Sequence, residues 1–258
     1  MLVISEANIV ILAVPKTGST ALEGALRHQA DMVFTKGRKH ITAQRYRNRV
    51  APFLKRTFGE QLETVAVMRE PLEQLRSWFC YRSQPRHAHT SKSTQEMTFN
   101  QFVRAVLKDT PPKYARVGSQ FRFLTDAHGG LLVTHLFSYE DQPKLLDFLS
   151  LRLGEDVALA RENVSPIRDT DLSARVEKKL REQRAPDFAL YNRLMAANGY
   201  LGPGWARSMD VFDMGRLAGS AQRPKALSAN STGLANTFGR SPFWDQSNGP
   251  HTPLRKAR

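Results

Sequence analysis

The feature that most constrains the fold is an uninterrupted apolar run, IVILAV at residues 9–14, that leads straight into the loop PKTGST at residues 15–20. A run of aliphatic and β-branched residues without alternation is typical of a strand buried on both faces, as in a parallel sheet. Residues 21–28, which follow the loop, carry apolar side chains at helical spacing. The sequence therefore predicts a strand, a loop and a helix in direct succession.

The same order recurs later in the chain. TVAVM at residues 64–68 predicts a second buried strand, and the REP that follows it ends the strand. Pro71 suits the first turn of a helix over residues 72–81. Because strands alternate with helices, we expect an α/β fold of the P-loop nucleotide-binding type, with three layers and a central, mostly parallel sheet flanked by helices.

The rest of the chain completes this pattern as far as residue 202. Periodicity predicts a strand at 131–137, helices at 99–107, 142–151, 177–184 and 187–197, and a loop at 82–95. Beyond residue 202 the chain is rich in Gly, Ser, Asn and Pro and has few periodic apolar positions. We therefore expect one domain at 1–202 and a basic tail at 203–258 that is disordered or loosely docked.

Charge indicates an anionic partner. The 258 residues include 38 Lys and Arg against 24 Asp and Glu, a net charge of +14. Residues 27–56 hold nine cations and one acid, and residues 203–258 hold eight cations and three acids. The first stretch is either a solvated face or an electropositive wall beside an anion site, and the sequence leaves both open.

Three further features suggest a cytoplasmic protein. The single cysteine, Cys80, has no internal partner for a disulfide. The N-terminus has no basic region before its apolar run, so we expect no secretory signal. No stretch approaches the ~20 apolar residues that span a bilayer, so we expect no transmembrane segment.

The loop at residues 15–20 has the composition of a phosphate-binding loop. Gly18 permits close approach of the backbone, and the first N–H groups of the next helix lack partners within that helix. Thr17, Ser19 and Thr20 add hydroxyls, and Lys16 adds a charge. The order differs from the G-x-x-x-x-G-K-[ST] of ATPases. The alternative is an ordinary turn with a capping Ser or Thr.

The second strand is followed by a cation where an NTPase would be expected to have a metal-binding acid. Arg69 follows TVAVM, and Ser77 lies in the next helix. A guanidinium and a hydroxyl are able to hold a second phosphate, and the carboxyl ends of parallel strands bring both motifs to one edge. The alternative is that Arg69 pairs with Glu70 or Glu73 and that Ser77 is merely exposed.

Together the two motifs resemble the sulfotransferase family. PKTGST resembles its 5′-phosphosulfate loop, and VAVMREPLEQLRSW resembles its 3′-phosphate segment. The similarity continues, in the order of bacterial and Golgi-type carbohydrate sulfotransferases, over about residues 8–200, with GSQF and FLTD at 118–126, FSYE at 137–140, NVS at 163–165 and DFALY at 187–191. The Golgi members carry a membrane anchor that we do not find here, so we expect a bacterial-type cytoplasmic enzyme.

The resemblance implies 3′-phosphoadenosine 5′-phosphosulfate as sulfuryl donor and adenosine 3′,5′-bisphosphate as product, with no metal. Lys16 would contact the bridging oxygen, residues 16–20 would hold the 5′-phosphate, and Arg69 with Ser77 would hold the 3′-phosphate. The acceptor would be a hydroxyl or amine of a carbohydrate or small alcohol.

The acceptor needs a base, and histidine is the usual choice. His40 lies between the two motifs, where cations should lower its pKa and keep it neutral. Glu23 is a carboxylate alternative, and the other candidate histidines are His28, His87, His89, His128 and His135.

Two other functions stay open. A P-loop nucleotide kinase or related phosphotransferase would use the same fold, but the Walker order is missing. A non-catalytic basic binding protein would explain the charge. Nucleic acid is not expected as a partner, because only Phe34, Tyr46 and Phe53 interleave with the cations.

Overall fold

The computed structural model describes residues 1–59, 61–160 and 166–204. The expected division at residue 202 falls close to the end of this part of the chain. Almost all of the predicted tail, from residue 205, and the NVS segment at 163–165 lie outside the described residues.

The core is a six-stranded sheet with the strand order β3-β1-β2-β4-β5-β6. The strands are β1 (Leu2–Ile4), β2 (Ile9–Leu12), β3 (Met32–Val33), β4 (Glu63–Met68), β5 (His135–Ser138) and β6 (Tyr200–Leu201). Only the central three, β2, β4 and β5, run parallel, and the other pairings are antiparallel. The expected mostly parallel sheet is therefore wrong: the sheet is mixed.

The antiparallel strands arise from short connections and short pairings. A tight turn joins β1 to β2, with Asn8 N–H donating to the Ser5 carbonyl at 2.9 Å, and so short a link permits only antiparallel pairing. β3 and β6 are two residues each, too short to show a period in the sequence. The expected strand at 131–137 is also corrected to β5, because Leu131 forms an isolated bridge with Thr125 instead.

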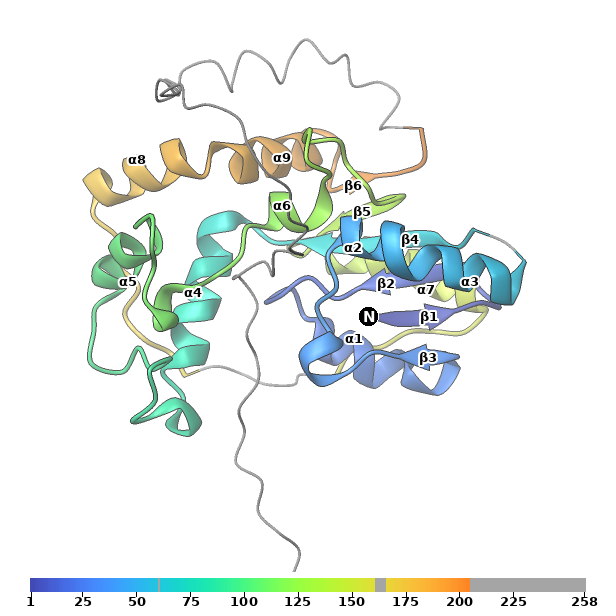
Figure 1. Ribbon diagram of the computed structural model, residues 1–258, viewed down its shortest axis with the longest axis horizontal. Helices are drawn as coiled ribbons and strands as arrows, with labels where there is room; N and C mark the ends of the chain where they lie inside the picture. Colours follow the sequence, from blue (N-terminus) through green and yellow to red (C-terminus); the bar gives the residue numbers. More distant parts are fainter. Residues whose placement is uncertain (60, 161–165, 205–258) are drawn as a thin grey trace, which may run out of the picture.

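Helices cover both faces of the sheet, which confirms the α/β class. They are α1 (Ser19–Leu26), α2 (Ala43–Arg45), α3 (Ala51–Phe58), α4 (Pro71–Arg82), α5 (Phe99–Val106), α6 (Gln120–Leu124), α7 (Gln142–Leu153), α8 (Ala174–Gln183) and α9 (Ala185–Ala196). One face packs against α1 and α7, and the other packs against α2, α3, α6 and α9. The arrangement is compatible with a three-layer fold (Figure 1).

A second hydrophobic core lies beside the sheet, among α4, α5 and α8. Phe79, Phe99 and Phe102 form its centre, with ring centroids 5.4–6.2 Å apart. Figure 1 shows these helices as a group to one side of the strands. Because α4 directly follows β4, this helical group stands next to the carboxyl ends of the parallel strands.

Candidate anion-binding site

The carboxyl ends of the three parallel strands bring the two predicted motifs together. Lys16 follows β2, Arg69 follows β4 directly, and Tyr139 follows β5 directly. The Arg69 guanidinium carbon lies 4.6 Å from the Tyr139 ring centre. A Cβ placed on Gly18 would lie 3.3 Å from the same ring. The side chain of Gln74 in α4 donates to the Pro15 carbonyl at 2.9 Å, which ties the second motif to the first.

The loop before α1 leaves backbone N–H groups without a helical partner. Gly18 is the N-cap, with φ of 72°, and no side chain caps the helix. The first bond of the helix runs from the Leu22 N–H to the Gly18 carbonyl, so the N–H groups of the preceding three residues have no carbonyl within α1. The alternative of a Ser or Thr cap is therefore not what the structure contains. This geometry favours an anion at the helix N-terminus.

The three hydroxyls of the loop have different surroundings. The Thr17 side chain is buried and donates to the Val14 carbonyl at 3.0 Å, so its proton is already used within the loop. Thr20 is exposed and accepts from the Lys39 amine at 3.1 Å. Ser19 is half-buried. The structure thus leaves Ser19 and Thr20 more accessible to a ligand than Thr17.

Lys16 is held by aromatic rings rather than by a carboxylate. Its amine lies 3.8 Å from the ring centre of Tyr81 and 5.6 Å from that of Trp78. It forms no ion pair with any carboxylate in the described part of the chain. Burial, then the charges of Arg69 and other arginines, lowers the pKa of Lys16 to about 7. An anion bound here would raise the pKa of Lys16 and so favour the charged ammonium form.

The Arg69 guanidinium has donor groups that its described neighbours do not use. Its Nε is buried and has no hydrogen-bond partner among the described residues, and its Nη2 lies 3.8 Å from Glu73, near the limit for an ion pair. Glu73 is in closer contact with Arg76, so the expected alternative of an Arg69–Glu73 pair is present only as a long contact. The buried Gln120 side chain holds the Arg69 backbone by accepting from its N–H and donating to its carbonyl.

Ser77 lies on α4, half-buried, at the expected spacing from Arg69. Its hydroxyl makes no hydrogen bond with any residue that the structure describes. The structure therefore leaves this hydroxyl free for a ligand but shows no contact that fixes its direction.

His40 is oriented by the end of β2. Its Nδ1 lies 2.7 Å from the Ala13 carbonyl, and because a carbonyl only accepts, Nδ1 carries the proton and Nε2 keeps its lone pair. The pKa of His40 is lowered, as expected, but burial is the largest cause and the charges of Lys39 and Lys16 come after it. The result is a neutral imidazole with one nitrogen available as a base.

Glu23 is a weaker candidate in this geometry. It forms ion pairs with Lys39 and Arg27, both at 2.9 Å. Burial acts to raise its pKa, but the hydrogen bonds and charges of these two cations prevail and lower it. A carboxylate with a lowered pKa is a poor proton acceptor near neutral pH.

The other candidate histidines have separate surroundings. His135 is buried in β5 between Tyr200 and Glu63, and His28 lies beside Glu155 at the surface. His128 and His89 are exposed. The His87 ring packs on Tyr81 with ring centres 5.0 Å apart, and its buried Nε2 makes no hydrogen bond within the described part of the chain. Tyr81 also contacts Lys16, so after His40 we consider His87 the histidine best placed near Lys16.

The sequence analysis assigned no role to several residues that shape this site. Tyr139, Tyr81 and Trp78 surround the two cations, and Gln74 and Gln120 fix their backbones. A signal existed for Tyr139, because it follows its strand just as Arg69 does, and ligands bind at that edge of a sheet. The other residues act through contacts distant in sequence, which no local pattern marks.

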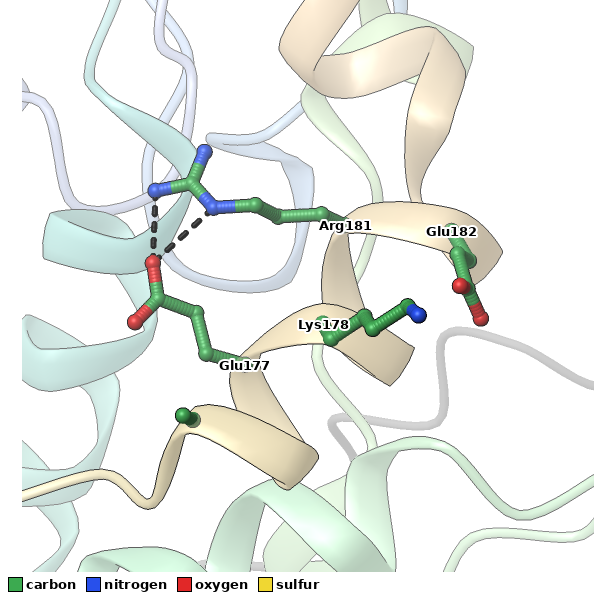
Figure 2. Close-up of a pocket in the computed structure, with 5 residues that line it drawn as sticks. Glu177, Lys178, Arg181 and Glu182 are labelled. Atoms are coloured by element: carbon green, nitrogen blue, oxygen red, sulfur yellow. Dashed lines mark hydrogen bonds and ion pairs between the residues drawn. The ribbon is translucent and has the colours of Figure 1, made fainter.

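A surface hollow elsewhere does not belong to this site. It lies along α8 and is lined by Ala174, Glu177, Lys178, Arg181 and Glu182. Figure 2 shows that Arg181 turns toward Glu177, with which it forms an ion pair at 2.7 Å. The charges that line this hollow are of both signs and come from one helix, whereas at the strand edge Lys16 has no ion pair among the described residues and Arg69 has only a long one.

The described residues contain neither a helix suited to span a membrane nor a group suited to hold a metal ion. Among residues 1–59, 61–160 and 166–204, no helix has the length and apolar character to cross a membrane. Within the same ranges, no three or more His, Cys, Asp or Glu side chains are grouped to hold a metal ion. Comparison of the chain with protein-family models, with curated proteins and with solved structures found no match.

Proposed function

We propose that this protein is a sulfotransferase that moves a sulfuryl group from 3′-phosphoadenosine 5′-phosphosulfate to an acceptor hydroxyl or amine. One observation carries the proposal. Lys16 and Arg69 follow adjacent parallel strands and lie against the rings of Tyr81 and Tyr139, respectively. Among the described residues, Lys16 forms no ion pair and Arg69 has only the 3.8 Å contact with Glu73. Two cations at one sheet edge, neither in close contact with a carboxylate, suit a ligand with two separate anionic groups.

The donor's two phosphate groups match the two halves of the site. The uncapped N-terminus of α1, with Gly18, Ser19 and Thr20, would hold the 5′-phosphosulfate. Arg69, whose buried Nε has no partner among residues 1–59, 61–160 and 166–204, would hold the 3′-phosphate with the Ser77 hydroxyl. Thr17 would contribute its backbone N–H, since its hydroxyl already donates to Val14.

The chemistry asks for charge stabilisation and a base, and two residues suit these roles. The donor supplies the sulfuryl group. Protonated Lys16 would stabilise negative charge on the oxygen that leaves. His40 would accept the acceptor's proton at Nε2, with Nδ1 anchored on the Ala13 carbonyl. The acceptor itself, a carbohydrate or a small alcohol, is not defined by these contacts.

Calorimetric titration of Arg69→Ala tests the proposal. The variant should lose far more affinity for adenosine 3′,5′-bisphosphate than for adenosine 5′-phosphosulfate, which has no 3′-phosphate. Loss of a charged hydrogen-bonding partner typically costs about 1.5–3 kcal/mol. Arg104→Ala, an exposed arginine on α5, is the matched control and should bind both nucleotides as the wild type does.

Two results would contradict the proposal. Equal losses for both nucleotides would mean that Arg69 does not read the 3′-phosphate. Tighter binding of ATP with Mg²⁺ than of the bisphosphate would favour a phosphotransferase instead.

A further inference from the structure

We propose that the segment at residues 36–56 is a binding surface for an acidic polysaccharide, a chain that carries sulfate or carboxylate groups and free hydroxyls. The segment contains a 3-10 turn (Lys36–Arg38), then α2, a π turn (Tyr46–Val50) and most of α3. We refer to its seven exposed cations as the basic surface.

The positive charge of the basic surface is not balanced by acidic residues in the same segment. No Asp or Glu occurs at residues 32–59. The seven side chains are exposed and make no ion pair, hydrogen bond or ring contact within the described part of the chain. They are Lys36, Arg38, Arg45, Arg47, Arg49, Lys55 and Arg56. A solvated helix face normally mixes both signs, so this one-signed surface favours a polyanionic partner.

The fold places these cations on the outside. The inward side of the segment is apolar: Ala43, Tyr46 and Leu54 are buried in the core. Figure 1 shows α2 and α3 as an outer layer over the sheet. The seven cations are therefore exposed on the outer side of the segment, away from the core that Ala43, Tyr46 and Leu54 enter.

The same segment is continuous with the candidate site. Lys39, the one cation of the stretch with a carboxylate partner, lies 2.9 Å from Glu23 and donates to Thr20 in the phosphate loop. The next residue is His40, which is anchored on Ala13. A chain lying along the basic surface would thus lead to the imidazole that we propose as the base.

The details of the surface favour a saccharide over other polyanions. Phe53 is the one large apolar side chain that is exposed on the described segment. Single-stranded nucleic acids need several stacking rings, and membrane binding needs an apolar face, whereas here that face packs on the core. Five of the seven cations are arginines, whose guanidinium fork matches carboxylate and sulfate groups.

This inference rests on the proposed function only in naming the chain as the acceptor, and binding can be measured without it. The surface variant is Lys36→Gln, Arg47→Gln and Lys55→Gln. The matched control is Arg175→Gln, Lys178→Gln and Lys179→Gln on α8, which removes the same charge from exposed positions. The probes are a labelled heparin oligosaccharide, a neutral dextran of the same length, single-stranded DNA, and vesicles containing phosphatidylglycerol.

At about 0.15 M salt, the wild type should bind heparin more tightly than DNA or vesicles, and dextran should not bind. The surface variant should lose roughly tenfold or more in heparin affinity, and the control should stay near wild type. Equal losses in the two variants, or stronger binding of DNA or vesicles, would overturn the inference. Calorimetry with adenosine 3′,5′-bisphosphate separates the hypotheses, because the surface variant should bind it normally. A wild type that binds heparin but not the bisphosphate refutes only the proposed function.

Discussion

The surroundings of Lys16 suit the anion-binding role that we propose for it. A carboxylate beside it would stabilise the ammonium group but would also compete with a bound phosphate. The face of Tyr81 stabilises a cation by about 0.5–2 kcal/mol and carries no net charge that competes. With Arg69 nearby and water largely excluded, the free protein therefore holds Lys16 close to losing its proton.

We predict that adenosine 3′,5′-bisphosphate binds with uptake of a proton at about pH 8. The pKa of Lys16 is about 7 in the free protein, so the amine is mostly neutral at that pH. A bound phosphate raises that pKa, hence a proton enters with the ligand, and affinity falls as the pH rises above 7. Calorimetry in two buffers of different ionisation enthalpy measures the uptake. Lys16→Met should abolish it, and an unchanged uptake in this variant would refute the assignment.

We predict that His40→Asn cuts sulfuryl transfer by ~10²–10⁴-fold and leaves bisphosphate affinity nearly unchanged. The asparagine amide is able to donate to the Ala13 carbonyl as Nδ1 does, so the fold is kept while the base is removed. Because the pKa of His40 is lowered and the base must be neutral, wild-type kcat/KM should fall only below the usual pKa of histidine. The variant should lack this acidic limb. If the His40→Asn variant is active and keeps the wild-type pH profile, His40 has only a structural role.

At the scale of elements, the site depends on where β2, β4 and β5 end. The last residues of β4 and β5, Met68 and Ser138, are aligned in the parallel register, and the last residue of β2, Leu12, pairs with Ala66, so the segments that follow the three strands reach the same edge. The loop after β2 turns sharply, and both Lys16 and Gly18 adopt positive φ. Gly18 thereby brings the start of α1 close to Tyr139, a position in which a side chain would be crowded.

We predict that Gly18→Ala lowers both stability and anion binding, and that Gly59→Ala lowers stability alone. Both glycines have positive φ, 72° and 81°, so alanine costs roughly 1–2 kcal/mol at either position. Only at Gly18 does the added Cβ also meet another side chain, 3.3 Å from Tyr139, whereas nothing lies within 4 Å at Gly59. Thermal melts and bisphosphate titrations compare the two. The same titration result for both variants would show that the contact with Tyr139 is unimportant.

At the scale of the molecule, α9 joins the hydrophobic core of the helical group to one of the two cores on the sheet. α9 contributes Phe188 to the core of α4, α5 and α8, and it contributes Leu190, Tyr191 and Leu194 to the core on the sheet. α4 continues directly from the site at the end of β4. We therefore expect the helical group and the sheet to unfold together.

We predict that Phe102→Ala destabilises the whole protein by about 3–5 kcal/mol in a single transition, because its fully buried ring leaves a cavity. Phe53→Ala is the matched control, since 45% of that residue is exposed, and it should cost far less. Denaturant unfolding followed by circular dichroism and by tryptophan fluorescence measures both. Two separate transitions in Phe102→Ala would show instead that the helical group unfolds on its own.

Local sequence determined the two strand–loop–helix units. The apolar run of β2 and the alternation-free TVAVM of β4 each carry their own burial signal, and Pro71 marks the start of α4. These signals depend on neighbours in the chain, so they could be read without the fold. They placed Lys16, Gly18 and Arg69 near the strand ends, whereas His40 lies at the end of β2 through a tertiary contact with the Ala13 carbonyl. The roles of all four residues stay predictions.

Tertiary structure decided what lies around those residues. β1, β3 and β6 are two or three residues long and exist because a neighbour pairs with them, so the mixed sheet had no local signal. Tyr81 reaches Lys16, and Gln120 reaches Arg69, across separations that no periodicity records. Burial lowers the pKa of His40 more than the nearby cations do, because desolvation depends on the packed surroundings and not on the sequence neighbours.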